Sequence, residues 1–410
     1  MPSPPFLRSV AMAAALLPAL SGAAPLTLDQ ALELAVQRSE SARAARAGVT
    51  SAAEAAQAAG QLPDPVLRAG VDNLPISGTD RFSSRDSMTM KRIGISQEWL
   101  SAEKRAARQA AADAMVGREG AAVQATAAEV RLQTGLAYLD AWFAGETLKL
   151  TTLMEHHAHE ELEAARARLS SATGSSQEVL ALTGARGVTE DETAEVRQQQ
   201  ATARAMLERW VGAQAGDLAA PASLQTPEEQ AYVASHPAVL AAQLDAELAR
   251  REAELARTSR NPNWSWEVSY GQRAGYPDMV SVGVSIPLTV APARRQDRDI
   301  ASKLALTEKT EAALAEATRM ATGEYRALAS DAKRLAERIE RYRATVATVA
   351  QQRTHAALAA YRSNQAPLMT LFEARHAEVE AQRKLLALQR DLAKTQAQLA
   401  LKPIPEGAAR

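Results

Sequence analysis

An internal duplication limits the possible folds of this chain more than any other feature. Two halves carry the same order of patterns at an offset of about 190 to 200 residues. Each half opens with an Ala-rich helical stretch, over 26–59 and over 226–259, and a proline follows each stretch. Thr27 and Thr226 are the expected N-caps, because a threonine hydroxyl accepts a hydrogen bond from a free N–H of the first turn. The sequence therefore predicts two structural repeats that each begin with a helix.

Behind each proline the hydrophobic period changes from 3.6 to 2, which is the pattern of a strand. The second half predicts a hairpin over 263–288, and the first half predicts one over 66–97. In the first hairpin the apolar residues change phase at Lys91-Arg92, which predicts a β-bulge there. Each hairpin has one apolar face and one face of small or polar residues. The most regular apolar positions are Trp264, Trp266, Val268, Tyr270, Val280, Val282, Val284 and Ile286.

Long helical hairpins follow, over 101–211 in the first half and over 293–401 in the second. The outgoing helix of each covers about 70 residues, which makes a rod of about 100 Å at 1.5 Å per residue. We expect Gly174 and Asn364, in the turns after these rods, to adopt the left-handed conformation that ends a helix. The predicted fold class is therefore mainly α with a small β part, built from duplicated long helical hairpins.

Short segments lie outside the two repeats, which we assign to 24–211 and 226–401. Residues 1–23 contain a positive charge, an apolar stretch and small residues, and predict a signal peptide for export from the cytoplasm. A linker at 212–225 joins the repeats, and a tail covers 402–410. Because no run of eighteen apolar residues follows the signal peptide, we expect no transmembrane helix. The exported chain is either soluble or inserted in a membrane by its strands.

Charge and composition exclude several functions. The 47 basic and 48 acidic residues balance, so no field of one sign is available to hold nucleic acid. The chain has no cysteine, which excludes disulfides, cysteine zinc sites, thiol catalysis and a lipid anchor on cysteine. The sequence has no phosphate-binding Gly-rich loop, no nucleophile elbow and no His-Glu-x-x-His motif. We therefore expect a protein that is not an enzyme and that uses no cofactor.

Four strands with one apolar face cannot close a barrel alone, since closure takes about eight strands or more. The chain is therefore expected to form an oligomer. Strands of about 9–11 residues with aromatic side chains near their ends have the dimensions of an outer membrane barrel. Trp264, Trp266, Tyr270 and Tyr276 are then membrane-interface aromatics. A soluble antiparallel sheet packed on helices is the alternative that the strand pattern leaves open, with these aromatics in its core.

Several short runs add a family resemblance to these patterns. They are Leu62-Pro63-Asp64-Pro65, Gly94-Ile95-Ser96-Gln97-Glu98 and Gly283-Val284-Ser285-Ile286-Pro287, the last followed by an Arg-rich helix start. Together with the two turns, and in this order over 26–401, they resemble the TolC-type outer membrane efflux protein family. The Pro-Asp-Pro and Ser-Gln-Glu runs are similar to those of its heavy-metal (CzcC/CusC-like) branch.

The resemblance implies a homotrimer in the outer membrane. Each chain would give four strands to a transmembrane β-barrel of twelve strands, which an α-helical tunnel of twelve helices continues into the periplasm. It also implies a periplasmic adaptor (membrane fusion) protein, an inner-membrane pump of the RND or ABC type, and contact with outer membrane lipid. The implied function is passive efflux of metal ions or small molecules. A soluble periplasmic coiled-coil adaptor or scaffold is the alternative, although an adaptor typically has one helical hairpin and this chain has two.

The resemblance further implies a gate at the far end of the tunnel. Family members often carry two acids just past the second turn, and the matching run here is Pro367 to Ala374. Glu373 stands at one acid position, whereas Thr370 stands at the other. The expected gate is therefore a pairing of Glu373 with Arg362, in place of a double ring of acids.

The first rod contains a histidine-rich run. His156, His159 and Glu160 follow the spacing i, i+3 and i+4, which places them on one helical face in a pattern that a divalent metal ion can use. The alternative is a solvated polar face of the rod, because such pairs are common in polar helices. A tunnel needs weak passage sites more than tight ones.

Overall fold

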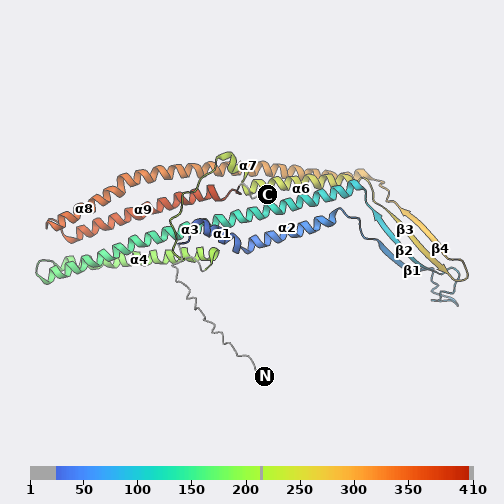
Figure 1. Cartoon of the computed structure of the whole chain (residues 1–410), viewed down its shortest axis with the longest axis horizontal. Coiled ribbons are helices and arrows are strands. Elements are labelled where there is room, and N and C mark those ends of the chain that lie inside the picture. Colours follow the sequence, from blue (N-terminus) through green and yellow to red (C-terminus); the bar gives the residue numbers. More distant parts are fainter. Residues whose placement is uncertain (1–24, 213–215, 406–410) are drawn as a thin grey trace, which may run out of the picture.

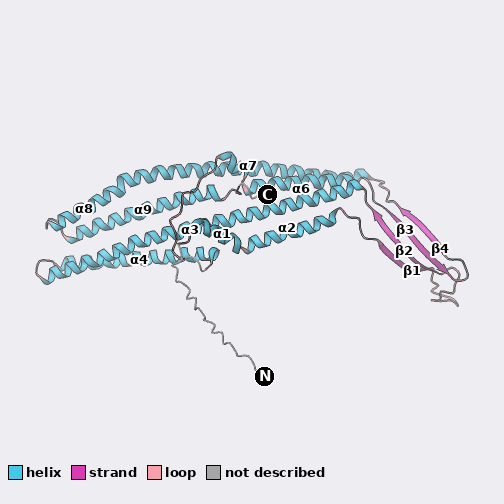
Figure 2. Ribbon diagram, viewed as in Figure 1, coloured by secondary structure: helices cyan, strands magenta, loops and turns pink. Residues whose placement is uncertain are grey.

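A layer of long helices continues at one end into an antiparallel sheet (Figure 1). The computed structural model describes residues 25–212 and 216–405 of the 410-residue chain. The predicted signal peptide, residues 1–23, lies outside the described residues. The fold is mainly α with a small β part, as the sequence predicts (Figure 2).

The chain passes through a similar order of elements twice. The elements of the first repeat are α1 (Leu28–Arg38), α2 (Glu40–Ala59), β1 (Val66–Asp72), β2 (Met90–Trp99), α3 (Ala102–Ser170) and α4 (Ser176–Val211). Those of the second repeat are α5 (Glu229–Ala234), α6 (Pro237–Thr258), β3 (Trp264–Arg273), β4 (Met279–Ser285), α7 (Gln296–Tyr342), α8 (Thr348–Arg362) and α9 (Leu368–Leu401). A π-helical segment, Arg343–Ala347, joins α7 to α8, so these three pieces form the second rod.

Helix α3 runs through the middle of the layer. Near the sheet, α2 lies on one side of α3, while α6 and then α7 lie on the other (Figure 1). Toward the opposite end α4 replaces α2, and α9 and α8 replace α6 and α7. The layer is thus four helices wide, with α2 and α4 at one edge and α7 and α8 at the other. Within residues 25–212 and 216–405, no helix combines the length and apolar character needed to cross a bilayer.

Two hydrophobic cores hold these helices together. One lies in the middle of the layer, where α1 packs on α3, α4 and α9 and where Leu32, Tyr138 and Leu207 are buried. The Tyr138 hydroxyl lies 2.7 Å from the carbonyl oxygen of Leu26 and 2.6 Å from that of Ala219. This contact holds part of the predicted linker against the first repeat. The second core joins α3, α4, α8 and α9 at the end distant from the sheet, which we call the tip.

The first helical stretch of each repeat is interrupted, although the sequence predicts one continuous helix over 26–59 and another over 226–259. In the first repeat Ser39 separates α1 from α2, and its hydroxyl accepts a hydrogen bond from the N–H of Ala42. In the second repeat Pro237 starts α6, because a proline lacks the N–H that would continue the preceding helix.

The two predicted threonine caps have different outcomes. Thr27 caps α1 and forms a capping box with Gln30, as expected. Thr226 is not an N-cap, because α5 begins later and the residue before it is Glu228. A small delay of the helix start is enough to move the cap, since the cap must directly precede the first helical residue.

The sheet has the strand order β1-β2-β3-β4, and all neighbours are antiparallel. Between β1 and β2 the register runs without a break from Val66 opposite Ser96 to Asp72 opposite Met90. The predicted bulge at Lys91-Arg92 is therefore wrong. The apparent change of phase arises because Met90 belongs to the polar face of the sheet, although its side chain is apolar.

Candidate functional site

The apolar face of the sheet is largely exposed. Along this face Ile95 pairs with Val268, and Val268 pairs with Val282. Val282 is 73% exposed and Leu67 is 66% exposed. The sheet extends beyond the end of the helical layer, so no described helix packs on it (Figure 2). A continuous apolar surface of this kind requires lipid or another protein to cover it.

Tryptophans mark the end of the sheet that is next to the helices. The rings of Trp99 and Trp264 have centroids 6.1 Å apart, and Trp266 follows on the same face of β3. Trp99 was not predicted as an interface aromatic, because the predicted first hairpin ends at residue 97. The signal was present, since Trp99 continues the alternation of Ile95 and Gln97.

Tyrosines mark the opposite end of β3. The Tyr270 hydroxyl donates a hydrogen bond to the carboxylate of Asp278, and the guanidinium of Arg273 lies 5.2 Å from the ring centre of Tyr276. Six residues separate Tyr270 from Trp264, which corresponds to about 20 Å along a strand. This spacing is close to the height of the apolar band between the aromatic girdles of an outer membrane barrel.

The polar face of the sheet carries charged residues in pairs. The Arg68 guanidinium lies 3.2 Å from the Glu267 carboxylate, and the Arg92 guanidinium lies 3.2 Å from the Asp72 carboxylate. Arg68, Arg92 and Glu267 border a hollow of about 380 Å³. The two faces of the sheet therefore differ in the way that a barrel wall requires, with charge on one side and apolar residues on the other.

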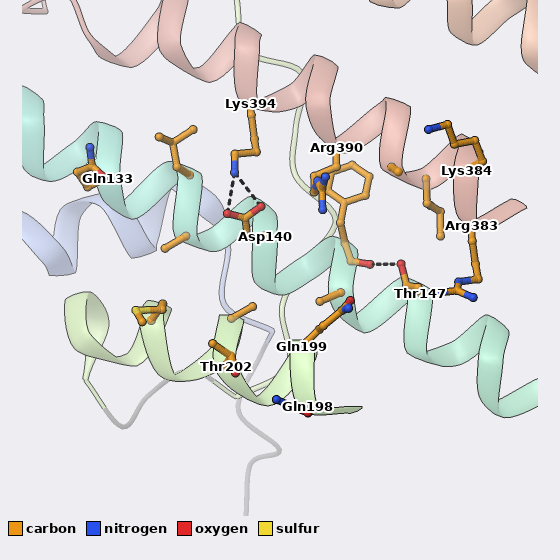
Figure 3. Close-up of a pocket in the computed structure, with 18 of the residues that line it drawn as sticks. Gln133, Asp140, Thr147, Gln198, Gln199, Thr202, Arg383, Lys384, Arg390 and Lys394 are labelled. Carbon is orange, nitrogen blue, oxygen red and sulfur yellow. Dashed lines mark hydrogen bonds and ion pairs between the residues drawn. The ribbon is translucent and has the colours of Figure 1, made fainter. Parts of the chain in front are cut away.

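A groove of about 1000 Å³ runs over α3 between α4 and α9 (Figure 3). The Lys394 ammonium lies 2.8 Å and 3.0 Å from the two carboxylate oxygens of Asp140 at its floor. The other labelled residues of the groove are Gln133, Thr147, Gln198, Gln199, Thr202, Arg383, Lys384 and Arg390. Apolar side chains, among them Phe143, Met206 and Trp210, line the groove together with these amide, hydroxyl and charged groups.

Both rods end in the same type of turn at the tip. Ala172 has φ 57° and Asn364 has φ 59°, and each is the second residue after its helix. The N–H groups of these residues and of the residues that follow donate back to carbonyls of the last helical turn, which is the Schellman motif. The left-handed conformation predicted for Asn364 is confirmed. The same prediction for Gly174 is wrong, because Ala172 adopts that conformation in the first turn.

Gly174 serves the turn in another way. A Cβ at this position would lie 2.9 Å from the backbone nitrogen of Leu169 and 3.0 Å from the carbonyl carbon of Arg168. The chain therefore passes directly over the end of α3, which only a glycine allows without a shift. It reaches Ser175, whose hydroxyl caps α4 by accepting from the N–H of Glu178 at 3.1 Å.

Glu178 also connects the two turns of the tip. Its carboxylate accepts a hydrogen bond of 2.9 Å from the N–H of Leu368, the first residue of α9. Pro367, which precedes α9, has no side chain that could cap this helix. A carboxylate at a helix N-terminus is favourable because it meets free N–H groups and the positive end of the helix dipole. The first repeat thus supplies the cap that the second repeat lacks.

A buried ion pair joins α3 to α9 just behind these turns. The Arg375 guanidinium lies 2.7 Å from Oε1 of Glu161, whose side chain is only 4% exposed. The other carboxylate oxygen, Oε2, has no hydrogen-bond partner. Burial raises the pKa of Glu161 to about 7, and Arg375 opposes this rise. This pair was not predicted, although Glu161 falls on the apolar stripe of Met154, Ala158 and Leu162.

The predicted gate residues surround this part of the tip. Arg362, Thr370 and Glu373 are all exposed. Within the described residues, neither Arg362 nor Glu373 forms an ion pair, so the predicted pairing is not made inside one chain. These side chains are available for contacts with another chain, and their role in a gate stays a prediction.

Two histidines of the histidine-rich run lie close to the same carboxylate, that of Glu160. Glu160 lies 3.3 Å from His156 and 3.3 Å from His157, and neither pair includes His159. The histidine contacts lower the pKa of Glu160. No described group of three or more His, Asp or Glu residues is arranged to hold a metal ion. Metal binding by His156, His159 and Glu160 stays a prediction.

The chain thus combines an open-edged antiparallel sheet, apolar and exposed on one face, with a helical layer four helices wide. No protein-family model matches this sequence, and no curated protein matches it. Solved structures do match it. CusC, described for transmembrane channel formation, has 14% identity and a TM-score of 0.75, with 92% of each chain covered.

Two further channel structures have the same fold. VceC, an outer membrane protein of Vibrio cholerae, has 18% identity and a TM-score of 0.74, covering 92% of this chain and 96% of that one. The open state of the MtrE outer membrane channel of Neisseria gonorrhoeae has 15% identity and a TM-score of 0.72, covering 92% and 88%. The chain therefore has the TolC-type outer membrane channel fold, as the sequence resemblance implies.

Proposed function

We propose that this chain is the outer membrane channel of a tripartite efflux system. The observation that carries the proposal is the exposed apolar face of the sheet, with Val280 at 69% and Val282 at 73% exposure. At about 25 cal/mol per Å², such a surface strongly favours transfer from water into lipid. The aromatic residues at the two ends of β3 would then lie at the two membrane interfaces.

The open edges of the protomer support a homotrimer. Strands β1 and β4 each have one partner in the sheet, and an unpaired edge inside lipid is not stable. Three copies would give twelve strands, enough to close a barrel. The same operation would bring the α7–α8 edge of one layer against the α2–α4 edge of the next and close a tunnel of twelve helices. The helical part would lie in the periplasm.

The proposed transport is passive, and its energy comes from partners. The sequence offers no phosphate-binding loop. The tip, at the end of the tunnel that is distant from the membrane, is the expected contact for a periplasmic adaptor and an inner-membrane pump of the RND or ABC type. The cargo is metal ions or small molecules.

The test is to express the chain with its leader in a Gram-negative host and to fractionate the cells. We expect the protein in the outer membrane, extractable only with detergent as a trimer that forms channels in planar bilayers. A monomer that osmotic shock releases would contradict the proposal and favour a soluble periplasmic adaptor. Ser281→Arg, on the polar face of β4, serves as the control for Val282→Arg on the apolar face. Only the second change should prevent insertion, because a cation in the middle of the lipid-facing band costs about 2–4 kcal/mol.

A further inference from the structure

Residues 227–236, which contain α5 and which we call the strap, cross α7 near the middle of the layer (Figure 1). The Tyr325 hydroxyl donates to the carbonyl oxygen of Pro227 at 3.1 Å. The Arg326 guanidinium lies 2.7 Å from the Glu229 carboxylate. Because neighbouring residues of a helix point about 100° apart, these contacts hold the strap on two sides of α7.

Glu324, the preceding residue of α7, joins the strap to the end of the described chain. Its Oε1 accepts hydrogen bonds from the Tyr232 hydroxyl at 3.2 Å and from the Lys402 ammonium. Close to Lys402, Ile404 is buried, and its N–H donates to the carbonyl oxygen of Ser235 in the strap at 2.9 Å. One carboxylate therefore holds two segments on α7 that lie far apart in the chain.

The last residue of the strap is a buried histidine, His236, whose side chain is 8% exposed. Its Nδ1 accepts a hydrogen bond of 3.2 Å from the N–H of Ala238 and so caps α6. A ring nitrogen that accepts carries no proton, so this imidazole is neutral and has its proton on Nε2. Within the described residues Nε2 has no hydrogen-bond partner, and Oε2 of Glu324 lies 3.6 Å from it.

A proton on Nδ1 of His236 disrupts these contacts. Nδ1 then no longer accepts from the N–H of Ala238, so α6 loses its cap. The positive imidazolium also faces the positive end of the α6 dipole. Lys402 binds the same carboxylate, so the two cations compete for Glu324 and repel each other. The neutral histidine is therefore compatible with the closed arrangement, and the cationic form opposes it.

His236 is the group of this cluster that changes charge at mildly acidic pH. Burial lowers the pKa of His236 and Lys402 lowers it further, while Glu324 opposes both. Burial and the contact with Glu324 raise the pKa of Tyr232. Burial acts to raise the pKa of Glu324, but the contacts with Lys402 and Tyr232 outweigh it and lower this pKa. Neither group therefore titrates between pH 5.5 and 7.5.

We propose that the strap is an acid-sensitive attachment, in which protonation of His236 releases the strap and the chain end from α7. The closed strap binds this proton less readily than the open strap, whose imidazole is in water. The closed state is therefore fully stable above the ordinary histidine pKa of about 6.5 and loses stability as the pH falls below it. This inference does not depend on the proposed channel function.

The test is hydrogen exchange of the Ile404 amide in the purified protein in detergent, expressed as a protection factor so that the intrinsic pH dependence of exchange cancels. We expect this factor to fall by up to about tenfold between pH 7.5 and 5.5, because protonation favours the open state by about that ratio. His236→Asn should not show the fall, since asparagine caps a helix without titrating. His355→Asn is the matched control, because His355 is exposed on α8, and it should respond as the natural chain does.

The Tyr232 amide provides a second measurement. It donates to the carbonyl oxygen of Glu228 at 2.9 Å in the first turn of α5 and reports on the strap itself. Lys402→Met removes the cation that opposes protonation, so the fall in Tyr232 protection should be smaller in this variant than in the natural chain. An equal fall there would overturn the proposal. So would an Ile404 protection factor that does not change with pH, or one that falls equally in His236→Asn.

Discussion

The two rods of this chain occupy unequal positions, although they come from similar sequence patterns. Helix α3 is one unbroken helix with neighbours on both sides, and it buries fifteen residues. In the second rod α7 buries three, and α8 and the π-helical segment bury none. A sequence repeat therefore specifies the elements but not their surroundings. The second rod, which we call the edge rod because it lies at one edge of the layer, has a neighbour on its outer side only if a second copy of the chain covers it.

The π-helical segment belongs to the same contrast. At Arg343–Ala347 the helix widens, and the Thr348 hydroxyl donates to the carbonyl of Arg343, five residues earlier, at 2.9 Å. Such a widening changes which side chains face a neighbour. It is absent from α3, which is α-helical throughout and has neighbours on both sides. The edge rod has no such neighbour on its outer side within one chain.

The largest difference between the rods should appear in their ion pairs. Arg375→Ala leaves the buried carboxylate of Glu161 without its partner and should destabilise the tip by about 3–5 kcal/mol. In the edge rod, Arg334→Ala removes a pair with Glu337 whose side chains are 75% and 44% exposed, and should cost less than about 0.5 kcal/mol. Hydrogen exchange of the amides in α3 and α9 near the tip measures the first change, and exchange of the α7 amides around Arg334 measures the second. Equal losses of stability would mean that the ion pairs of the two rods are equally buried, which would contradict the comparison.

Truncation of apolar side chains should separate the stability of one chain from that of the assembly. Leu162→Ala, at a position 1% exposed in α3, should cost about 2–4 kcal/mol in monomer and trimer alike. Val349→Ala, at a position 46% exposed in α8, should change the monomer by less than about 0.5 kcal/mol and weaken only the trimer. Denaturation in detergent measures the stability of one chain, and mass photometry measures the fraction of trimer. A loss of monomer stability in Val349→Ala would contradict the assignment of α8 to the edge.

The pH dependence of the tip tests the burial of Glu161 directly. Because burial raises its pKa from 4.5 to about 7, the folded chain binds a proton in this range that the unfolded chain does not bind. The stabilisation from this group is therefore complete below pH 4.5 and is lost as the pH rises through 7. In the natural chain the free energy of unfolding of the tip should fall by about 2–3 kcal/mol between pH 4.5 and 8, and Glu161→Gln should not show this fall.

The chain has no cysteine, which makes the measurement of this pH effect simple. Spin labels on single cysteines placed at exposed positions of α4 and α8 would report the separation of the two helical hairpins. We expect a wider distance distribution at pH 8 than at pH 5 in the natural chain, and none of this change in Glu161→Gln. A pH response that persists in the variant would assign the effect to another group.

The sequence predicts those parts of the fold that depend on local patterns. The period of 2 predicted the strands of the sheet, and the period of 3.6 predicted the long helices of the layer. The repetition of both patterns predicted the duplication. The interruptions of the first helices were not predicted, since Ser39 and Pro237 stand within Ala-rich stretches whose helical pattern continues on both sides. The phase error at Met90 has a similar origin, because an apolar side chain on a polar face imitates a bulge.

The contacts at the tip could not be predicted, because they join residues far apart in the chain. Glu178 and Leu368 are separated by 190 positions and Glu161 and Arg375 by 214. No local spacing indicates such a pair. The sequence does show an acid, Glu161, on an apolar stripe. Because a buried carboxylate is costly unless it is paired, this position predicts a buried cation opposite it.

The smallest expected difference concerns the left-handed residues that end the two rods. An alanine in this conformation costs about 1 kcal/mol relative to glycine, whereas asparagine tolerates it better. Ala172→Gly should therefore stabilise the first turn by about 1 kcal/mol, which slows local hydrogen exchange about fivefold, and Asn364→Gly should gain only a few tenths. Ser171→Gly is the control, since Ser171 has φ −90° and gains nothing from glycine. If amide exchange in Ala172→Gly were no slower than in the natural chain, the left-handed conformation at Ala172 would carry no net cost. The contacts of Gly174 with the end of α3 would then offset it, and the two turns would be equally stable despite their different residues.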